Sequence, residues 1–346
     1  MRCSIIPPYL LRAVAEAGPE PARSRARETL LVDAEVRRLR EDARAPGWAA
    51  GAGEAVAALA PKRTVSDAHH GQPPGTVVRH EGGPATGDGA ADRAYDGLGA
   101  TYGFYAQVYS RDSLDGRGMP LRASVHVQRG WDNAEWDGER MLFGDGDGEV
   151  FGDFTSSLDV IGHELTHGVT QYEAAFDYQG QSGALNESMS DVFGSCVKQW
   201  SLQQTAEQAD WLIGEELLLP GVHGVALRSM KAPGTAYDDP RLGGKDPQPA
   251  NMRDYVETSE DEGGVHLNSG IPNHAFYLAA TAIGGSSGEG AGRVWYAALR
   301  DRTLTPQADF AAFAAATLRA AQAVGGSAPG AVRAAWTAVG VEPTGS

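Results

Sequence analysis

Hydrophobic residues recur at helical spacing in two short segments near the amino-terminal end of the chain. Residues 9–17 carry leucine or valine at positions 10, 11 and 14 and are followed by Gly18, which predicts a short helix. Residues 28–44 predict a second, charge-rich helix, and residues 45–60 then change to alanine, glycine and proline, a composition typical of a linker. We therefore expect the first 60 residues to form an appendage rather than a self-sufficient domain.

From Thr64 onward the pattern changes to short β segments separated by glycine. Apolar and polar residues alternate over residues 124–128, and a glycine-rich turn follows at residues 144–148, which predicts antiparallel strands. Between these β segments, residues 90–111 have the apolar spacing of a helix. This part of the chain is therefore predicted to be β-rich, with one long helix.

The second half of the chain has mainly helical spacing. It predicts helices over residues 159–175 and 183–200, the second interrupted at Gly194, and a later helix that opens at Thr305–Pro306 and runs to Val324. A β-rich half followed by a helical half predicts an α+β fold, with a cleft where the two halves meet.

Charge is unevenly distributed along the 346 residues. The formal net charge is −16, but residues 1–63 contain 11 basic and 8 acidic residues, whereas the remainder contains 18 basic and 37 acidic residues. A weakly basic segment before a strongly acidic body is consistent with docking of one on the other, and equally with a drift in surface composition. So acidic a body argues against nucleic acid as a partner.

Two cysteines, Cys3 and Cys196, are too few for a disulfide framework, so the fold would tolerate a reducing compartment. Cys196 lies in an apolar helical run and is predicted to be buried and unreactive. No apolar run approaches about 18 residues, which predicts no membrane span. Pro7 and Pro8 interrupt the first apolar stretch, so no Sec signal peptide is expected.

The sequence His-Glu-Leu-Thr-His at residues 163–167 carries the strongest chemical signal. On an α-helix, His163 and His167 lie one turn apart on the same face, where their imidazoles can bind one Zn²⁺. Glu164 lies about 100° around the helix from His163 and can contact a metal-bound water without being a ligand. Because so short a pattern also occurs by chance, a catalytic site requires a third ligand elsewhere.

That third ligand is expected within residues 183–191 (Gly-Ala-Leu-Asn-Glu-Ser-Met-Ser-Asp). Glu187 and Asp191 share one helix face, so one can bind zinc while the other accepts the second ring N–H of a histidine ligand. The alternative, an acidic face in solvent, fits poorly because the helix is otherwise apolar. Two histidines and one glutamate leave a fourth coordination position for water. Thr170 and Glu173 exclude the metzincin pattern, which needs glycine and histidine there.

The zinc helix and the Asn-Glu-Ser-Met-Ser-Asp segment, at this interval, resemble the thermolysin-like neutral metallopeptidases, and the resemblance extends from about Thr64 to the carboxyl terminus. It implies a two-lobed gluzincin fold with a β-rich lobe over residues 64–180, which carries the zinc helix, and a helical lobe over residues 181–346. It also implies one catalytic Zn²⁺. The ligands would be His163, His167 and Glu187, and the general base would be Glu164.

Further matches to this family assign other residues to the site. Tyr178 and His266 match the groups that stabilise the oxyanion, while Asp191 and Asp261 match carboxylates that orient His163 and His266. The matches that bind substrate are Asn133 and Ala134 on an edge strand, Arg228 toward a substrate carbonyl, and an apolar pocket of Phe151, Phe154, Val160, Ile213 and Leu227. Such a pocket implies cleavage on the amino side of bulky hydrophobic residues.

One departure from the family concerns calcium. Asp159, Asp210 and Glu215 match acidic ligands of its double calcium site, but Lys198 and Leu212 occupy two further acidic positions. A lysine ammonium would offset the repulsion between the remaining carboxylates and would repel Ca²⁺. The ligands of another calcium site are replaced by Leu219 and Val225. No double calcium site is therefore expected.

The beginning of the chain resembles a narrower group. Residues 4–11 (Ser-Ile-Ile-Pro-Pro-Tyr-Leu-Leu) and a prosegment of only about 60 residues are similar to the protealysin-like subgroup, whose short propeptide is removed during maturation. This implies that residues 1–60 are propeptide and linker, that they inhibit the enzyme from within the cleft, and that the mature chain begins between Ala45 and Thr64. Cys3 could approach the zinc as a thiolate or be a buried or free thiol.

Together these features predict a zinc-dependent neutral endopeptidase of peptides and proteins, made as a zymogen and monomeric. The resemblance favours secretion by a route other than Sec, with a cytoplasmic enzyme as the alternative. Two other functions remain open. A zinc aminopeptidase uses a similar zinc helix and a downstream glutamate, although the acidic motif for a free amine is missing. A non-catalytic binding protein on a protease fold is the second, although every expected catalytic position is occupied.

Overall fold

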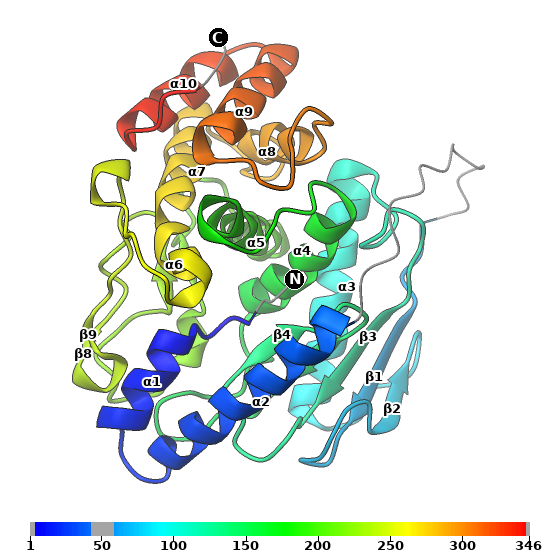
Figure 1. Cartoon of the computed structure of the whole chain (residues 1–346). Helices are drawn as coiled ribbons and strands as arrows, with labels where there is room; N and C mark the ends of the chain where they lie inside the picture. The colour runs from blue at the N-terminus through cyan, green and yellow to red at the C-terminus, as the bar shows by residue number, and fades with distance from the viewer. Residues whose placement is uncertain (1–3, 43–58, 344–346) are drawn as a thin grey trace.

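The structure is a computed structural model that describes residues 4–42 and 59–343, except for the side chains of residues 34–42. Two helices come first, α1 (Pro8–Ala17) and α2 (Ala22–Asp42). α1 begins at Pro8 because a proline in the first helical turn lacks only an N–H that has no partner there. Figure 1 shows α2 crossing the front of the molecule next to β4, with α1 near β8 and β9.

The amino-terminal lobe contains a five-stranded mixed sheet in the order β2-β1-β3-β5-β4. Its strands are β1 (Arg63–Asp67), β2 (Thr76–His80), β3 (Leu121–Val125), β4 (Ala134–Trp136) and β5 (Met141–Phe143). β1 pairs antiparallel with β2, and β4 with β5, but β3 is parallel to both β1 and β5. The expectation of antiparallel strands was therefore wrong for β3. For the β1–β3 pair the reason is α3 (Gly89–Tyr109), which crosses over between β2 and β3 and packs on the sheet, because parallel strands need such a connection.

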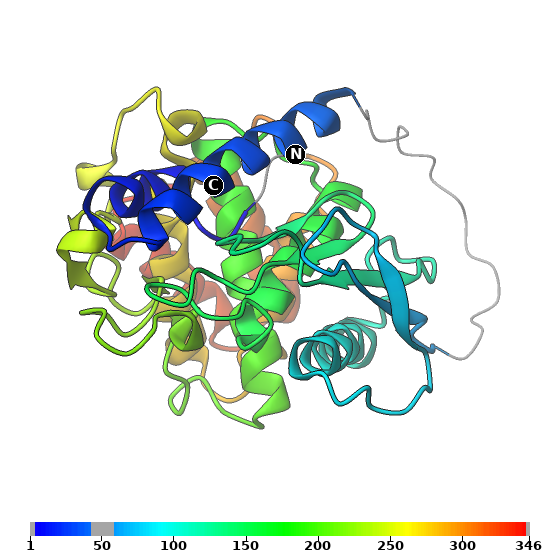
Figure 2. The ribbon, with the colours of Figure 1, turned by 90° about the horizontal axis from the view of Figure 1, so that it is seen from below.

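The helical lobe follows the central pair α4 (Leu158–Tyr172) and α5 (Gly180–Ser201). Its short elements are β6 (Leu212–Ile213), η1 (Glu215–Leu217), β7 (Arg228–Ser229), β8 (Asp238–Asp239), η2 (Pro240–Leu242), β9 (Gly244–Lys245) and η3 (Met252–Asp254). Its helices are α6 (Asp261–Asn268), α7 (Gly270–Ile283), α8 (Ala291–Leu299), α9 (Phe310–Val324) and α10 (Ala328–Ala338). Figure 2 shows α4 and α5 in the centre, between the sheet and the remaining helices.

Two sequence predictions about helices were wrong. The last long helix begins at Phe310 rather than Pro306, because the Asp309 carboxylate accepts the Ala312 N–H and caps it there. Gly194 does not interrupt α5. A Cβ at Gly194 would lie 2.4 Å from the Asp159 carbonyl oxygen on α4, so this glycine is needed for the close approach of the two helices.

Two other features agree with the sequence. Cys196 is buried and free, and its burial raises the pKa of its thiol well above the ordinary value, which keeps it unreactive. Within the described ranges no helix is sufficiently long and apolar to cross a membrane.

Candidate active site

Three potential metal ligands converge where α4 and α5 face each other. The Nε2 atoms of His163 and His167 are 3.0 Å apart, and they lie 3.5 and 3.6 Å from the Glu187 carboxylate oxygens. All three residues are buried, and their ligand atoms lie within 4.8 Å of one another. Two nitrogens bound to a tetrahedral Zn²⁺ would be separated by about 3.3 Å, so the donor set and spacing fit this metal.

Both histidines are held by hydrogen bonds from α5. His163 Nδ1 lies 2.8 Å from Asp191 Oδ1, and His167 Nδ1 lies 2.8 Å from Asn186 Oδ1. An N–H at Nδ1 that donates to these acceptors leaves the Nε2 lone pair directed at the metal position. Asp191 was expected here from the sequence, whereas Asn186 was missed. Its signal was its place immediately before Glu187 on the same helix.

Asp191 is also the centre of a wider charge network. Arg228 donates from Nε and Nη2 to the two oxygens of Asp191, at 2.9 and 2.8 Å, and Asn273 donates to Oδ2 at 2.8 Å. Burial alone would raise the pKa of the Asp191 carboxyl, but Arg228 and His163 outweigh it and hold that pKa well below its ordinary value. Asp191 therefore stays ionised and fixes both a metal ligand and Arg228.

Glu164 lies beside the edge strand of the sheet. Its Oε2 accepts the backbone N–H of Trp136, in β4, at 2.9 Å, and the side chain is fully buried. Because Glu164 follows His163 on α4, the carboxylate is held between the metal position and β4 without joining the ligand set.

Tyr178 and His266 form the opposite side of the site. The Tyr178 hydroxyl lies 3.3 Å from His266 Nε2 and donates to Glu187 Oε1, and His266 Nδ1 lies 2.7 Å from Asp261 Oδ1. Burial alone would lower the pKa of His266, but the Glu187 and Asp261 carboxylates outweigh it and raise that pKa to about 9. A cation bound to Glu187 would reduce the effect of this carboxylate on the pKa of His266.

The amino-terminal segment Ser4–Ile6 lies across this site without regular secondary structure. Ile5 donates its N–H to the Ala134 carbonyl at 3.2 Å, and Ile6 donates to Asn133 Oδ1 at 3.0 Å. Its carbonyls lie close to two further site residues: the Ile5 oxygen accepts from Arg228 Nη1, and the Ser4 oxygen is next to His266 Nε2, each at 3.2 Å. The structure thus brings three residues predicted to bind substrate (Asn133, Ala134 and Arg228) and one predicted to stabilise the oxyanion (His266) around residues 4–6. Cys3 lies outside the described residues.

The five residues predicted to form the apolar pocket are all buried in the main core. Leu227 and Ile213 are joined by a backbone hydrogen bond of 3.0 Å, and the rings of Phe151 and Phe154 are 6.3 Å apart. Val160 lies in the first turn of α4, three residues before His163. The structure shows these side chains as part of the core around the site.

Lys198 lies among the carboxylates that match acidic calcium ligands of the family. Its Nζ is 2.9 Å from Asp210, 3.2 Å from Asp159 and 3.5 Å from Glu215. The expectation of a lysine ammonium beside these carboxylates is confirmed, and the absence of calcium stays a prediction. Leu212 offers only its backbone N–H, which donates to Asp210 at 2.9 Å. Leu219 also bonds through its backbone, and Val225 is exposed.

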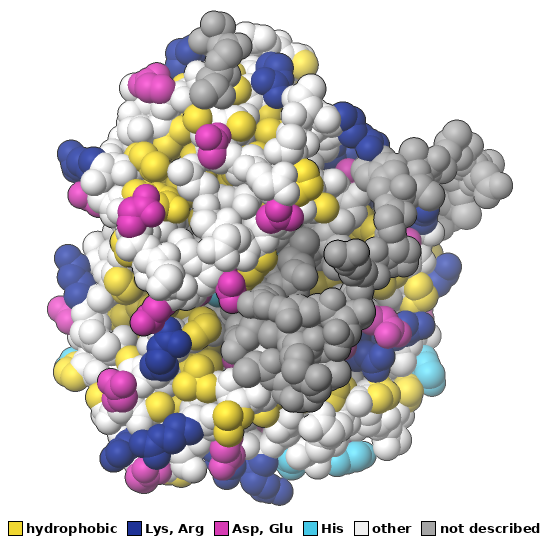
Figure 3. Space-filling model, viewed as in Figure 1, with side chains coloured by type: hydrophobic (Ala, Val, Ile, Leu, Met, Phe, Trp, Pro, Cys, Tyr) yellow, Lys and Arg dark blue, Asp and Glu magenta, His cyan; other side chains and the backbone are white. Residues whose placement is uncertain are grey.

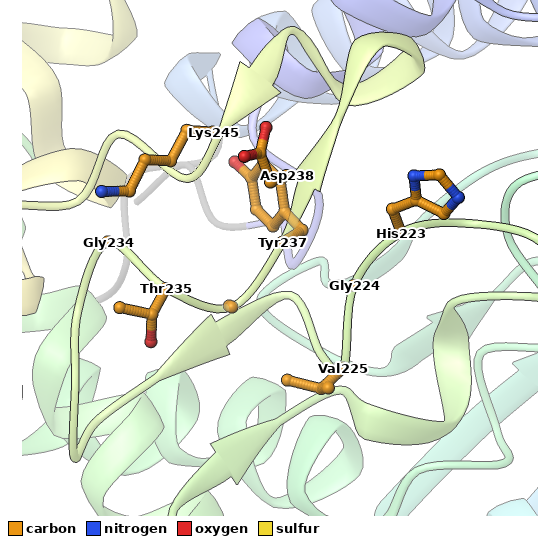
Figure 4. Close-up of a pocket in the computed structure, with 9 residues that line it drawn as sticks. His223, Gly224, Val225, Gly234, Thr235, Tyr237, Asp238 and Lys245 are labelled. Atoms are coloured by element: carbon orange, nitrogen blue, oxygen red, sulfur yellow. The ribbon is translucent and has the colours of Figure 1, made fainter.

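A separate surface cavity of about 380 Å³ lies beside β8 and β9 (Figure 4). It is lined by residues 223–225, 234–238 and Lys245. His223 and Lys245 lie on opposite sides of the close-up, with Tyr237 between them. None of the residues predicted for the catalytic site lines this cavity.

Comparison with known proteins agrees with this geometry. Residues 62–171 match the family model of the thermolysin metallopeptidase catalytic domain, and residues 174–341 match that of the thermolysin metallopeptidase alpha-helical domain. The chain therefore belongs to the thermolysin metallopeptidase family. Residues 3–31 match the protealysin propeptide, so this is a member of the family with that type of propeptide.

Individual relatives support the same assignment. The chain is 52% identical over 342 residues to an extracellular metalloprotease of Pectobacterium carotovorum subsp. carotovorum, covering 98% of this chain and 96% of the relative. The solved precursor of protealysin from Serratia proteamaculans is 51% identical, with a TM-score of 0.89, over 98% of this chain and 99% of that one. A thermolysin of Alicyclobacillus acidocaldarius subsp. acidocaldarius is 41% identical over 74% of this chain and 46% of its own. The protein is accordingly a zinc-dependent neutral metalloprotease made as a zymogen with a propeptide.

Proposed function

We propose that the enzyme is an endopeptidase that cleaves on the amino side of a bulky hydrophobic residue. The observation that supports this proposal is the binding of the segment Ser4–Ile6. Its backbone N–H groups donate to Ala134 and Asn133 on one side, and its Ile5 carbonyl accepts from Arg228 on the other. In a substrate bound the same way, the carbonyl at the Ser4 position faces His266, and the next residue takes the place of Ile5. Ile5 is a buried aliphatic residue, consistent with a preference for leucine, isoleucine, valine or phenylalanine after the cleaved bond.

The proposed metal ligands are His163, His167 and Glu187. Zn²⁺ held by them would lower the pKa of a bound water and polarise the scissile carbonyl. Glu164, fixed by the Trp136 N–H, accepts the proton of the attacking water and delivers it to the leaving amine.

The remaining residues bind and orient. His266 and Tyr178 donate hydrogen bonds to the carbonyl oxygen as it gains negative charge, so they stabilise the transition state more than the ground state. Asp261 holds the His266 ring, and Arg228, fixed by Asp191, donates to the carbonyl of the residue after the cleaved bond. Asn133 and Ala134 align the substrate backbone.

In the zymogen, residues 4–6 occupy the substrate position and α1 and α2 hold them there, so substrate cannot enter. Arg12 of α1 also pairs with Glu260 of the helical lobe at 2.8 Å, a direct contact between the basic first segment and the acidic body. Such an exposed pair contributes little to stability. The proposed cleavage region, between Ala45 and Thr64, falls largely outside the described residues.

The proposed setting is outside the cell, by a route other than Sec, because the Pectobacterium relative is named an extracellular metalloprotease. A cytoplasmic enzyme is the alternative. We further propose a monomer with no nucleic-acid or membrane partner. On the face drawn in Figure 3, Lys and Arg side chains are interspersed with Asp and Glu.

The role of Glu164 gives the most direct test. Glu164→Gln should bind zinc as the wild type does, but lose casein hydrolysis by about 10²–10⁴-fold. Intact mass and amino-terminal sequencing should show that only active protein loses its propeptide. Glu149→Gln, an exposed site, is the matched control. Casein hydrolysis at the wild-type rate by Glu164→Gln would show that the proposed base is wrong.

A further inference from the structure

A carboxylate from α2 is bound by the catalytic lobe next to the segment in the cleft. Asp33 Oδ1 accepts from Trp131 Nε1 at 3.0 Å, and its Oδ2 accepts from Asn133 Nδ2 at 2.8 Å. Asp33 is only 2% exposed, so this carboxylate is buried between α2 and the lobe. Two N–H donors that converge on one buried carboxylate form a site for that chemical group.

The contact is part of one continuous face of α2. Arg25, Thr29 and Asp33 follow at helical spacing, and each bonds to the segment 129–133 that precedes β4. Arg25 donates to the Arg129 carbonyl at 3.1 Å, and the Thr29 hydroxyl oxygen accepts the Asp132 N–H at 3.1 Å. This face therefore covers the segment that leads into β4, next to the place where Ile6 is bound.

Both donors are positioned by the catalytic lobe itself. The Trp131 ring packs in a small hydrophobic cluster with Ala68, Val127 and Leu142 of this lobe, and Val32 of α2 packs against the cluster. Asn133 Oδ1 accepts the Ala134 N–H at 3.1 Å, which sets the direction of its Nδ2. Removal of α2 would therefore uncover the two donors while the groups that hold them remain in place.

The donors also lie at a defined position relative to a substrate. Asn133 accepts the Ile6 N–H on its oxygen and donates to Asp33 from its nitrogen. A carboxylate in the place of Asp33 thus lies next to the second residue after the cleaved bond. It can come from a free carboxyl terminus at that residue or from an acidic side chain on the residue that follows.

We propose that Trp131 Nε1 and Asn133 Nδ2 form a carboxylate-binding subsite of the mature enzyme. Asp33 fills it in the zymogen, and a substrate carboxylate fills it during cleavage. The inference rests on the proposed function, because it places the substrate backbone where residues 4–6 lie. Its consequence is a specificity for negative charge two or three residues after the cleaved bond, in addition to the hydrophobic preference next to that bond.

Four blocked peptides test the subsite in matured wild-type enzyme. All have leucine as the first residue and alanine as the second residue after the cleaved bond. Two continue to a third residue, Asp-amide or Asn-amide, and two end at the alanine, as a free carboxylate or as an amide. A charge-assisted pair of hydrogen bonds should raise kcat/KM about tenfold for Asp-amide over Asn-amide, or for the carboxylate over its amide. The pair that shows the rise identifies the source of the carboxylate. Equal values within both pairs would overturn the subsite alone, whereas no cleavage of any peptide would overturn the proposed cleavage before a hydrophobic residue.

Trp131→Phe removes one donor and keeps an aromatic ring in the cluster. The ratio of kcat/KM between the charged and the neutral peptide should therefore fall toward one. Trp200→Phe, at the carboxyl-terminal end of α5 against Phe104, is the matched control and should keep the wild-type ratio. An unchanged preference in Trp131→Phe would overturn the role of this indole.

A zymogen experiment does not depend on folding of a tryptophan variant. Asp33→Asn replaces the charged acceptor by a neutral amide, so the full-length chain should lose its propeptide several-fold faster. The rate of this loss is measured by intact mass. Glu16→Gln, exposed on α1, should mature at the wild-type rate. A wild-type rate for Asp33→Asn would show that the two donors do not bind this carboxylate strongly, which contradicts the subsite.

Discussion

The helix pair α4–α5 carries two clusters of ionisable groups, and they differ in how their charge is balanced. Around His163 and Glu187, two histidine nitrogens and a carboxylate converge in a group that could hold a metal ion, and His266 lies 3.5 Å from the Glu187 carboxylate. About three turns along α5 from Glu187, Lys198 supplies the cation and lies within 3.5 Å of three carboxylates. Between the clusters, Gly194 and Gly162 bring the helices into close contact.

The difference separates a site for a metal from a site that needs none. A buried carboxylate requires a partner because removing its charge from water costs several kcal/mol. In the first cluster, the ligand geometry directs that partner to be a metal ion, with Asp191 and Asn186 holding the histidines. In the second cluster, the partner of the carboxylates is the lysine ammonium. It lies on a flexible side chain and imposes no coordination geometry. One framework thus supports a reactive site and a structural one.

The largest expected effect comes from removing the lysine. Lys198→Met removes the ammonium that lies beside Asp159, which is fully buried, and beside the more exposed Asp210 and Glu215. The free energy of unfolding should fall by about 3 kcal/mol, measured by urea unfolding of the full chain in the Glu164→Gln background to prevent self-digestion. Burial raises the pKa of Asp159, and loss of Lys198 would raise it further, so the defect should shrink as the pH falls and that carboxyl is protonated.

Zinc content provides the comparison for that variant. If the two clusters are independent, Lys198→Met should bind zinc as tightly as the parent. Loss of zinc together with stability would mean that the lysine cluster supports the metal site through α4 and α5, and that the two regions act as one.

The next effect concerns the orientation of a metal ligand. Asp191→Asn keeps the shape of the side chain but removes the charge that holds His163 and Arg228. Zinc affinity should fall by about 10–100-fold, measured by competition with a chelator. Asp261→Asn is the matched control, because Asp261 holds His266 rather than a proposed ligand. Equal zinc affinity in the two variants would contradict the role given to Asp191.

How far the sequence predicted these regions depends on the range of the interactions. His163 and His167 are separated by one helical turn, so helical geometry alone predicted their shared face. The position of Lys198 followed from its place among family acidic residues, and the structure confirms its contacts. Gly194 was misread because helix propensity contains no information about a neighbouring helix. The parallel pairing of β3 depends on a crossover through α3, which local alternation of residues does not encode.

The donors of the proposed carboxylate subsite were beyond the reach of sequence patterns. Asp33 is about 100 positions from Trp131 and Asn133, and no spacing rule connects them. The contact arises when α2 packs along the segment that leads into β4. The segment Ser4–Ile6 is a similar case: its resemblance to a propeptide implied inhibition in the cleft, whereas the individual hydrogen bonds came from the structure.

A smaller effect is expected when the lysine cluster is changed into a site that can bind a metal ion. Lys198→Glu combined with Leu212→Asp restores two acidic positions beside Asp159, Asp210 and Glu215. Added calcium at ten times its Kd should then stabilise this variant by about 1.4 kcal/mol, seen as a rise in Tm, and should leave the wild type unchanged. Lys198→Gln with Leu212→Asn, of similar size but without the charges, is the control. A calcium-dependent rise in the wild type would contradict the expectation that Lys198 excludes the ion.

The smallest effect is a pH dependence at the proposed carboxylate subsite. Asp132 lies between the two donors in sequence and is fully buried. Burial, then the charges of Asp147 and Asp33, raise its pKa well above the ordinary value, against the opposite effects of a hydrogen bond from the Asp147 N–H and of Arg25. A carboxylate in the subsite therefore favours the protonated form of Asp132, and its binding takes up a proton.

The sign of the pH dependence follows from that uptake. The preference for Asp-amide over Asn-amide should be greatest at low pH and fall as the pH rises from the pKa of Asp132 in the empty site toward its higher value in the filled site. One proton limits the change to about tenfold per pH unit. Ratios of kcat/KM measured across this range should become independent of pH in Asp132→Asn. A preference that grows with pH in the wild type would mean that Asp132 is ionised beside the bound carboxylate, and that the charge balance proposed for the subsite is wrong.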